Sequence, residues 1–294
     1  MSIIPFQSKT RMFEMDIGNI MLLLLWGVLV GFVFSSIGAA GGILASFGLI
    51  TVIGVSDPNS VKPMAQILAI AIALVFIPGY FKRKAWIMPL GLILSAGGII
   101  GAIVGSTVSS KYLSDMSSFK PLFGILSFLV AVQISWKLYK HKKNDKPALC
   151  ASKSGVENIV TSASLLTFEY AGESYKIRTW EPLLAGFIIA FIASIFGVGG
   201  GFLLVPYLAT VIGIPMFIVP ATAALSVLIS ALISVTNYIR MGSEIDYYLL
   251  GFLIIGGILG AKLGPKINQI MKDNWLQGSL AFIVAAIGTK YLFI

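Results

Sequence analysis

The sequence predicts an all-α polytopic membrane protein built from two homologous repeats, and three observations carry this prediction. Of its 294 residues, 57% are hydrophobic and only 11% are charged, whereas soluble domains carry about 25% charged residues. The apolar runs are continuous, which disfavours a membrane β-barrel with its alternating segments of about ten residues. Five such runs precede a single polar stretch and five follow it. This composition excludes a soluble enzyme, a disordered chain and a secreted disulfide scaffold.

The charged residues, the single cysteine and the single histidine narrow the possible functional classes further. The net charge of +9 does not indicate nucleic-acid binding, because the basic residues lie in short clusters between apolar runs, as in membrane proteins generally. Cys150 and His141 are the single cysteine and histidine, so neither a disulfide framework nor a Cys/His metal site is expected. The N-terminal segment lacks the small-residue cleavage site of a signal peptide. No cofactor is implied.

The apolar runs are long enough to be helices, and they divide the chain into three regions. The first repeat, residues 1–140, contains Ile17–Phe34, Ile43–Val55, Val61–Tyr80, Trp86–Ser109 and Phe119–Leu138. Residues 141–179 form a polar linker. The second repeat, residues 180–294, contains Glu181–Phe196, Phe202–Ile214, Ile218–Ile239, Tyr247–Leu263 and Trp275–Phe293. The matching lengths of the two sets indicate a duplication.

Sequence identities at a constant offset of 159 residues support the duplication. The segment Gly38-Ala39-Ala40-Gly41-Gly42 aligns with Gly197-Val198-Gly199-Gly200-Gly201, and Ser35 aligns with Ser194. At the same offset, Thr51-Val52-Ile53-Gly54 aligns with Thr210-Val211-Ile212-Gly213. One register kept over about 70 positions is typical of an internal repeat.

Each repeat opens with two short segments joined by a glycine-rich break. At about 1.5 Å per residue, Glu181–Phe196 and Phe202–Ile214 reach roughly 24 and 20 Å, less than a hydrocarbon core of about 30 Å. We therefore expect a hairpin or broken helix with its glycine turn inside the membrane, buried in protein or lining a wet cavity. If each half crosses the membrane an odd number of times, the second half is inverted relative to the first. If each half crosses the membrane four times, the two halves are parallel. Inversion is favoured because it brings the two breaks together near the midplane.

The linker contains the pattern of a β-hairpin over residues 165–178. Aromatic and β-branched residues in Leu165–Tyr170 and Ser174–Arg178 flank a turn that contains Gly172. A gate and a simple tether between the halves are both compatible with this small domain, and the tether is favoured.

The glycine breaks are the strongest candidate for a binding site. Glycine lets backbone N–H groups approach a ligand closely, and the first N–H groups of the helix after each break are unpaired and favour an anion. Serine hydroxyls just before each break could add donors. The candidate residues are Ser35, Gly38, Gly41, Gly42, Ser194, Gly197, Gly199, Gly200 and Gly201. The alternative is that these glycines only allow tight helix packing.

Polar residues on two other helices extend the candidate site. Thr222, Ser226, Ser230 and Ser234 recur every four residues and form a hydroxyl stripe, with Thr222 and Ser226 as the best site candidates. The stripe suits a hydrated path and helix–helix hydrogen bonding equally well. Lys62 and Gln66 form a similar pair; Lys62 could attract an anion or extend its ammonium to the membrane interface.

Glycine ridges and missing residue types complete the pattern. Gly97, Gly101 and Gly105 recur every four residues, as do Gly256, Gly260 and Gly264, and these ridges are assigned to close helix packing. The predicted segments carry no Asp, Glu or His in mid-helix, so the sequence lacks the residue set that an intramembrane enzyme needs.

The segment Gly197–Pro206, followed by Ala221-Thr222, resembles the second-half signature of the TauE/SafE sulfite exporter family, also called the 4-toluene sulfonate uptake permeases. The first half departs from the pattern, with Ala39 and Ala40 in the glycine run and Lys62-Pro63 in place of Ala221-Thr222. The resemblance implies a secondary transporter in the plasma membrane, the inner membrane of a bacterium. Its substrates would be small anions such as sulfite or organosulfonates, with export commoner than uptake.

The expected partners are the small anion, the lipid bilayer and a coupling ion, H⁺ or Na⁺. The sequence leaves the oligomeric state open. A membrane scaffold without transport activity is the alternative from another functional class.

Overall fold

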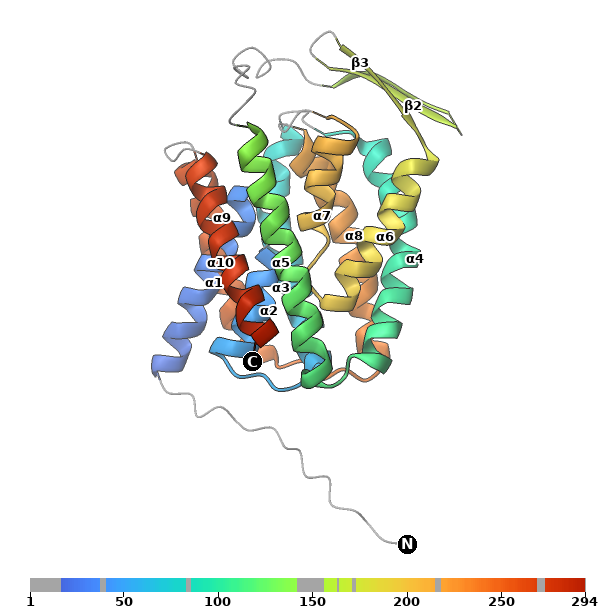
Figure 1. Ribbon diagram of the computed structural model, residues 1–294. Coiled ribbons are helices and arrows are strands. Elements are labelled where there is room, and N and C mark those ends of the chain that lie inside the picture. The colour runs from blue at the N-terminus through green and yellow to red at the C-terminus, as the bar shows by residue number, and fades with distance from the viewer. Residues whose placement is uncertain are drawn as a thin grey trace, which may run out of the picture.

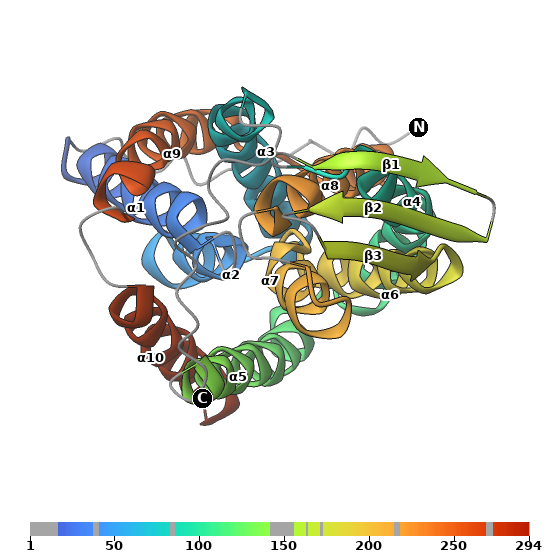
Figure 2. The ribbon, with the colours of Figure 1, turned by 90° about the horizontal axis from the view of Figure 1, so that it is seen from above.

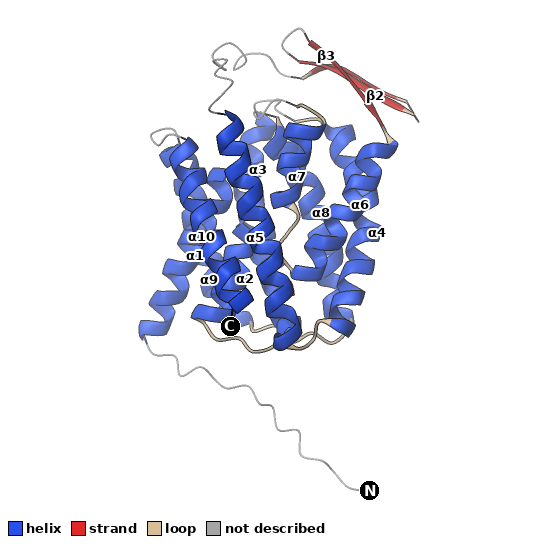
Figure 3. Ribbon diagram, viewed as in Figure 1, coloured by secondary structure: helices blue, strands red, loops and turns tan. Residues whose placement is uncertain are grey.

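The computed structural model describes residues 17–37, 41–82, 86–141, 156–162, 164–170, 173–214, 218–268 and 273–293. These residues form a bundle of helices with a small sheet at one end (Figures 1 and 3). The first half contains α1 (Ile17–Ile37), α2 (Gly41–Phe47), the π-helical turn η1 (Gly48–Val52), α3 (Pro58–Lys82), α4 (Met88–Tyr112) and α5 (Met116–His141). The second half contains α6 (Trp180–Phe196), α7 (Gly201–Pro206), the π-helical turn η2 (Tyr207–Val211), α8 (Val219–Arg240), α9 (Tyr247–Asn268) and α10 (Asp273–Phe293).

The order of elements repeats between the halves in the register of the sequence alignment. The π-helical turns η1 and η2 start at Gly48 and Tyr207, and α4 and α9 start at Met88 and Tyr247, both pairs 159 residues apart. A proline precedes only the second π-helical turn, because Pro206 corresponds to Phe47. The turn therefore belongs to the repeat and does not depend on the proline.

Five helices are long and apolar enough to cross a membrane: Ile17–Ser36, Pro58–Val75, Met88–Tyr112, Met116–Trp136 and Thr222–Arg240. Shorter apolar helices cover Gly41–Val52, Trp180–Phe196, Tyr247–Leu263 and Ala281–Phe293. These short helices include Gly41–Val52, the arm after the first glycine break, and Trp180–Phe196, the arm before the second break, and the sequence predicts short segments at both places.

The helices pack mainly across the two halves. α1 lies along α9, α6 lies along α4, and α5 pairs with α10, as seen from above in Figure 2. The glycine ridges allow these approaches: a Cβ atom on Gly101 would overlap the carbonyl of Phe187 in α6, and one on Gly260 would overlap the carbonyl of Val28 in α1. The assignment of the ridges to close packing is therefore confirmed at these positions.

The linker folds into a three-stranded antiparallel sheet in the order β1-β2-β3. β2 (Leu165–Tyr170) pairs with β3 (Glu173–Arg178) in the predicted hairpin. β1 (Glu157–Thr161) adds a strand that the sequence analysis missed. Alternate residues of β2, namely Leu166, Phe168 and Tyr170, are buried in one hydrophobic cluster with residues of α4, α7 and α8. The sheet thus covers the broken helix of the second half (Figure 2).

Candidate functional site

The second glycine break has a backbone that requires glycine at two positions. α6 ends at Phe196 because Gly197 adopts the left-handed conformation, with φ 71°, and its amide bonds to the carbonyl of Ala193. Gly199 also has a positive φ, of 60°. Side chains other than glycine rarely adopt this region. The chain then enters α7 at Gly201.

Several amides in this break remain available. Gly201 donates its amide to the carbonyl of Gly199, and Leu204 donates to Gly200. Within the described part of the chain, the amides of Gly199, Gly200 and Phe202 have no such backbone acceptor. The break therefore contains buried backbone donors without a backbone acceptor, and such donors bind anions in other proteins.

The first break is described in part. Gly38 lies outside the described residues, whereas Gly41 and Gly42 are buried at the start of α2. The Ser35 hydroxyl donates to the carbonyl of Phe32, within its own helix. In this structure Ser35 therefore contributes its hydroxyl to α1 and not to the break.

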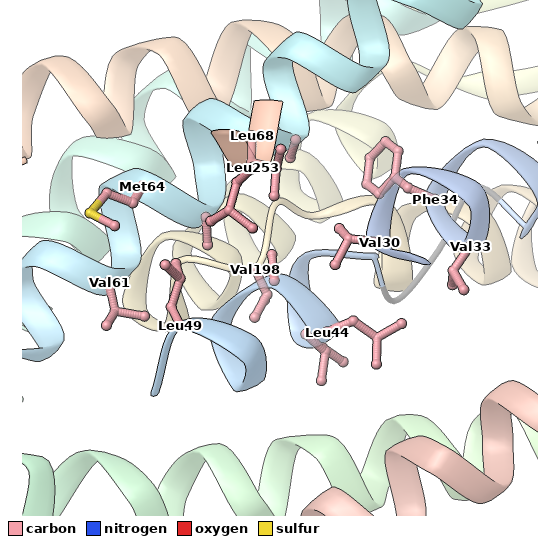
Figure 4. Packing of buried hydrophobic residues seen from close by; sticks show 14 of the residues in the cluster. Val30, Val33, Phe34, Leu44, Leu49, Val61, Met64, Leu68, Val198 and Leu253 are labelled. Atoms are coloured by element: carbon pink, nitrogen blue, oxygen red, sulfur yellow. The ribbon is translucent and has the colours of Figure 1, made fainter. Parts of the chain in front are cut away.

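The two breaks lie against each other. A Cβ atom on Gly42 would overlap the backbone of Val198 at its carbonyl, so α2 approaches the second break at backbone distance. Val198 is buried among first-half side chains such as Leu44, Leu49 and Leu68 (Figure 4). The structure thus brings together two glycine segments that are 159 residues apart in the chain.

Helix α3 forms one wall of the second break. A Cβ on Gly197 would overlap the backbone of Lys62, and one on Gly199 would lie 3.6 Å from the Cβ of Ala69. Gln66 falls between these two contacts on the same helical face. It is 1% exposed, and among the described residues its Oε1 has no hydrogen-bond partner. A buried amide whose oxygen has no partner, next to a glycine break, is a candidate ligand group.

Lys62 is completely buried, so the expectation that its ammonium could reach the membrane interface is wrong. Nζ donates to the carbonyl of Leu113 at 2.7 Å, to Asn59 Oδ1 at 3.2 Å and to the carbonyl of Ser109 at 3.4 Å. The backbone of α3 packs against Gly197, and the Lys62 side chain points toward the C-terminus of α4. All three ammonium donors are used there.

Ser194 is buried at the end of α6, beside the second break. Its carbonyl accepts a hydrogen bond from the hydroxyl of Tyr238, at 2.8 Å. The next carbonyl, that of Ile195, accepts one from the hydroxyl of Ser109, at 2.6 Å. Tyr238 was missed by the sequence analysis, because nothing in the local pattern separates it from the aromatic residues of a membrane interface.

Tyr238→Phe is expected to destabilise the protein by about 1–3 kcal/mol, because it leaves the buried carbonyl of Ser194 without its donor. Thermal unfolding of the purified protein in detergent measures this loss. Tyr248→Phe is the matched control, since Tyr248 is 78% exposed. Equal melting temperatures for the two variants would contradict the role given to the Tyr238 hydroxyl.

The hydroxyl stripe of α8 takes part in contacts between helices. Thr222 accepts a hydrogen bond from the amide of Ile87, which precedes α4, and donates to the carbonyl of Ile218. Asn237, at the other end, donates to Ser106 Oγ in α4 at 2.7 Å. Ser226 is buried beside Val227, whose Cγ1 would lie 3.8 Å from a Cβ on Gly199. Of the two favoured stripe residues, Ser226 is therefore adjacent to a residue that contacts the break.

A known protein family matches nearly the whole sequence. The profile described as "Sulfite exporter TauE/SafE" matches residues 23–291. The chain belongs to the sulfite exporter TauE/SafE family.

Relatives of this TauE/SafE protein are named as transporters. It is 25% identical to "Probable membrane transporter protein YunE" of Bacillus subtilis (strain 168) over 284 residues. The aligned region covers 94% of this chain and 98% of that relative. It is 28% identical over 243 residues to a "Probable membrane transporter protein" of Xylella fastidiosa (strain 9a5c), covering 81% of this chain and 80% of the relative. No solved structure matches the chain. The TauE/SafE protein is therefore a multi-pass membrane transporter and not an enzyme.

Proposed function

We propose that this TauE/SafE protein is a secondary transporter of small sulfur-containing anions, such as sulfite or organosulfonates, and that it works by alternating access around the facing glycine breaks. The observation that carries the proposal is the backbone contact between Gly42 and Val198. It joins the two halves where each helix is interrupted. Binding sites of repeat transporters form between such broken helices.

Backbone groups and neutral side chains are the proposed ligands of the anion. The amides of Gly199, Gly200 and Phe202 supply donors, and the Gln66 amide can turn its NH₂ group toward the same place. The buried side chain of Ser226 is the next candidate. Neutral donors of this kind suit a dehydrated oxyanion, because they leave no unpaired charge buried in the protein when the site is empty.

We propose that the two halves are inverted in the membrane. In Figure 1, α1 rises from the lower end of the bundle, whereas α6 descends from the sheet at the upper end. The contacts between halves are reciprocal, since α1 packs on α9 as α6 packs on α4. Reciprocal contacts are typical of a two-fold relation, and opposite helix directions support an axis in the membrane plane.

The distribution of basic residues supports the upper end of Figure 1 as the cytoplasmic end. α3, α5 and α9 all end there, and their last turns or the loops after them carry Lys82-Arg83-Lys84, Lys137–Lys146 and Lys266. Basic residues accumulate on the cytoplasmic side of membrane proteins. The sheet of residues 157–178 would then lie in the cytoplasm.

Flux of labelled sulfite and sulfonates into liposomes that contain the purified protein tests the proposal. Gly200→Val is expected to abolish this flux while the protein still folds. A Cβ on Gly200 would lie 3.2 Å from Cγ2 of Ile189 and 3.5 Å from Cβ of Ala193, so a small shift of the Ile189 side chain makes room for it, and the new side chain then occupies the break. The control is Gly251→Val, where no atom lies within 4 Å of a Cβ. If liposomes with the wild-type protein showed no flux, the scaffold alternative would be favoured. If Gly200→Val kept full flux, the second glycine break would not be part of the binding site.

A further inference from the structure

The buried ammonium of Lys62 has the surroundings of a monovalent cation site. Its hydrogen-bond acceptors are two backbone carbonyls and one side-chain amide oxygen, from Ser109, Leu113 and Asn59. The rings of Phe119 and Tyr238 face it, with centroids 5.1 and 6.0 Å from Nζ. Neutral oxygens and aromatic faces are the groups that bind a desolvated cation.

The position of this cluster in the fold favours positive charge. α4 ends at Tyr112 and its C-cap is Leu113, so the accepting carbonyls belong to the last turn, where the helix dipole is negative. Among the described residues no carboxylate forms an ion pair with Lys62. Asp57, which is exposed, is the charged group that acts on it electrostatically. The ammonium is thus held by dipoles and rings.

The cluster is connected directly to the second glycine break. The backbone of Lys62 contacts Gly197, and Tyr238 and Ser109 hold the last carbonyls of α6. A charge here lies between α3, α4 and α5 of one half and α6 and α8 of the other. The equivalent position of the second half is Ala221, so a lysine occupies this position in the first half and not in the second.

We propose that Lys62 is the resident cation of the transporter: its ammonium fills a site, made by Asn59, Ser109 and Leu113, that would otherwise bind Na⁺. The ends of interrupted or buried helices hold Na⁺ in transporters of other architectures. Here a covalently attached ammonium satisfies the same oxygens. The consequence for coupling rests on the proposed transport function: anion flux through the wild-type protein does not depend on Na⁺.

The site can be tested without any transport measurement. Purified wild-type protein and the Lys62→Ala variant are melted in NaCl and in choline chloride of equal concentration. We expect no difference between the salts for the wild type, and a rise of about 3 °C or more in Na⁺ for Lys62→Ala. Lys62→Met, which refills the space with an apolar chain, should not respond to Na⁺.

Two further variants control this experiment. Lys111→Ala removes an exposed lysine from the last turn of α4, the helix that supplies the Ser109 and Leu113 carbonyls, and should not create a response to Na⁺. Asn59→Ala combined with Lys62→Ala removes one of the proposed ligand oxygens, and the stabilisation by Na⁺ should fall. If Lys62→Ala is too unstable to purify in choline, recovery of monodisperse protein in Na⁺ is the expected result.

The outcomes separate this proposal from the proposed function. A wild-type protein that is itself stabilised by Na⁺, or a Lys62→Ala variant that gains nothing from Na⁺ or is not recovered in it, would overturn the resident-cation proposal. In liposomes, sulfite flux should be equal in Na⁺ and choline for the wild type and at least tenfold higher in Na⁺ for Lys62→Ala. Absence of sulfite flux in the wild type would contradict the transport proposal alone, since the melting experiment is independent of it.

Discussion

Gly42→Ala is expected to abolish anion flux in proteoliposomes. A Cβ atom at this position would overlap the carbonyl group of Val198, and a backbone group cannot move aside as a flexible side chain can. The two glycine breaks must then separate, which displaces the amides proposed to bind the anion. Small misplacements of binding groups can reduce rates about 100-fold, so flux should fall below detection in the assay used for the wild type.

The control for Gly42→Ala is Gly251→Ala, because a Cβ on Gly251 would meet no atom within 4 Å. Both variants should be recovered in the membrane, with a lower melting temperature for Gly42→Ala alone. Flux at the wild-type rate through Gly42→Ala would show that the contact between the breaks is not part of the pathway. Equal loss in both variants would point to a general effect of replacing glycine.

Gly101→Ala is expected to destabilise the fold, because it adds a methyl group where α4 and α6 are in backbone contact. The added Cβ would overlap the carbonyl of Phe187 in α6, and overpacking of this kind costs about 1–3 kcal/mol, occasionally more. Unfolding in mixed micelles of increasing denaturing detergent measures the change. Anion flux at low temperature, where the variant is still folded, should persist, since the glycine ridge lies between helices and not at the breaks.

The same experiment can be made in the second half at Gly260, which is equivalent to Gly101. Gly260→Ala would overlap the carbonyl of Val28, the counterpart of Phe187 in the first half, so its effect should match that of Gly101→Ala. Gly251→Ala lies on the same helix as Gly260 and is expected to leave stability unchanged or slightly higher. A large effect at Gly101 with none at Gly260 would contradict the equivalence of the two ridges.

The helices themselves were largely predictable, because their lengths and apolar content are local properties of the chain. The predicted segment Tyr247–Leu263 starts where α9 starts, and Glu181–Phe196 differs from α6 by one residue at its N-terminus. The repeat was visible because glycine and threonine positions keep one offset. By contrast β1 was missed, since its pairing with β2 depends on a register between separate strands and not on a turn signal.

The candidate site was predictable only in outline. The glycine breaks were identified from their composition, and the need for glycine at Gly197 and Gly199 follows from positive φ angles. The surroundings of the other candidate residues could not be predicted from the sequence. Thr222 bonds to the amide of Ile87, and Lys62 is buried where the sequence allowed an interfacial position. Each outcome depends on a neighbour far away in the chain.

The sequence by itself determined the membrane class, the helical segments, the duplication and the two glycine breaks, because hydrophobicity and residue spacing are read along one chain. The tertiary structure decided which helices pair across the halves, that Gly42 meets Val198, and that the Lys62 ammonium turns to the end of α4. The physical reason is that these contacts join segments with large sequence separation. Their geometry is set by the close approach of backbones, which no periodicity within a single helix specifies.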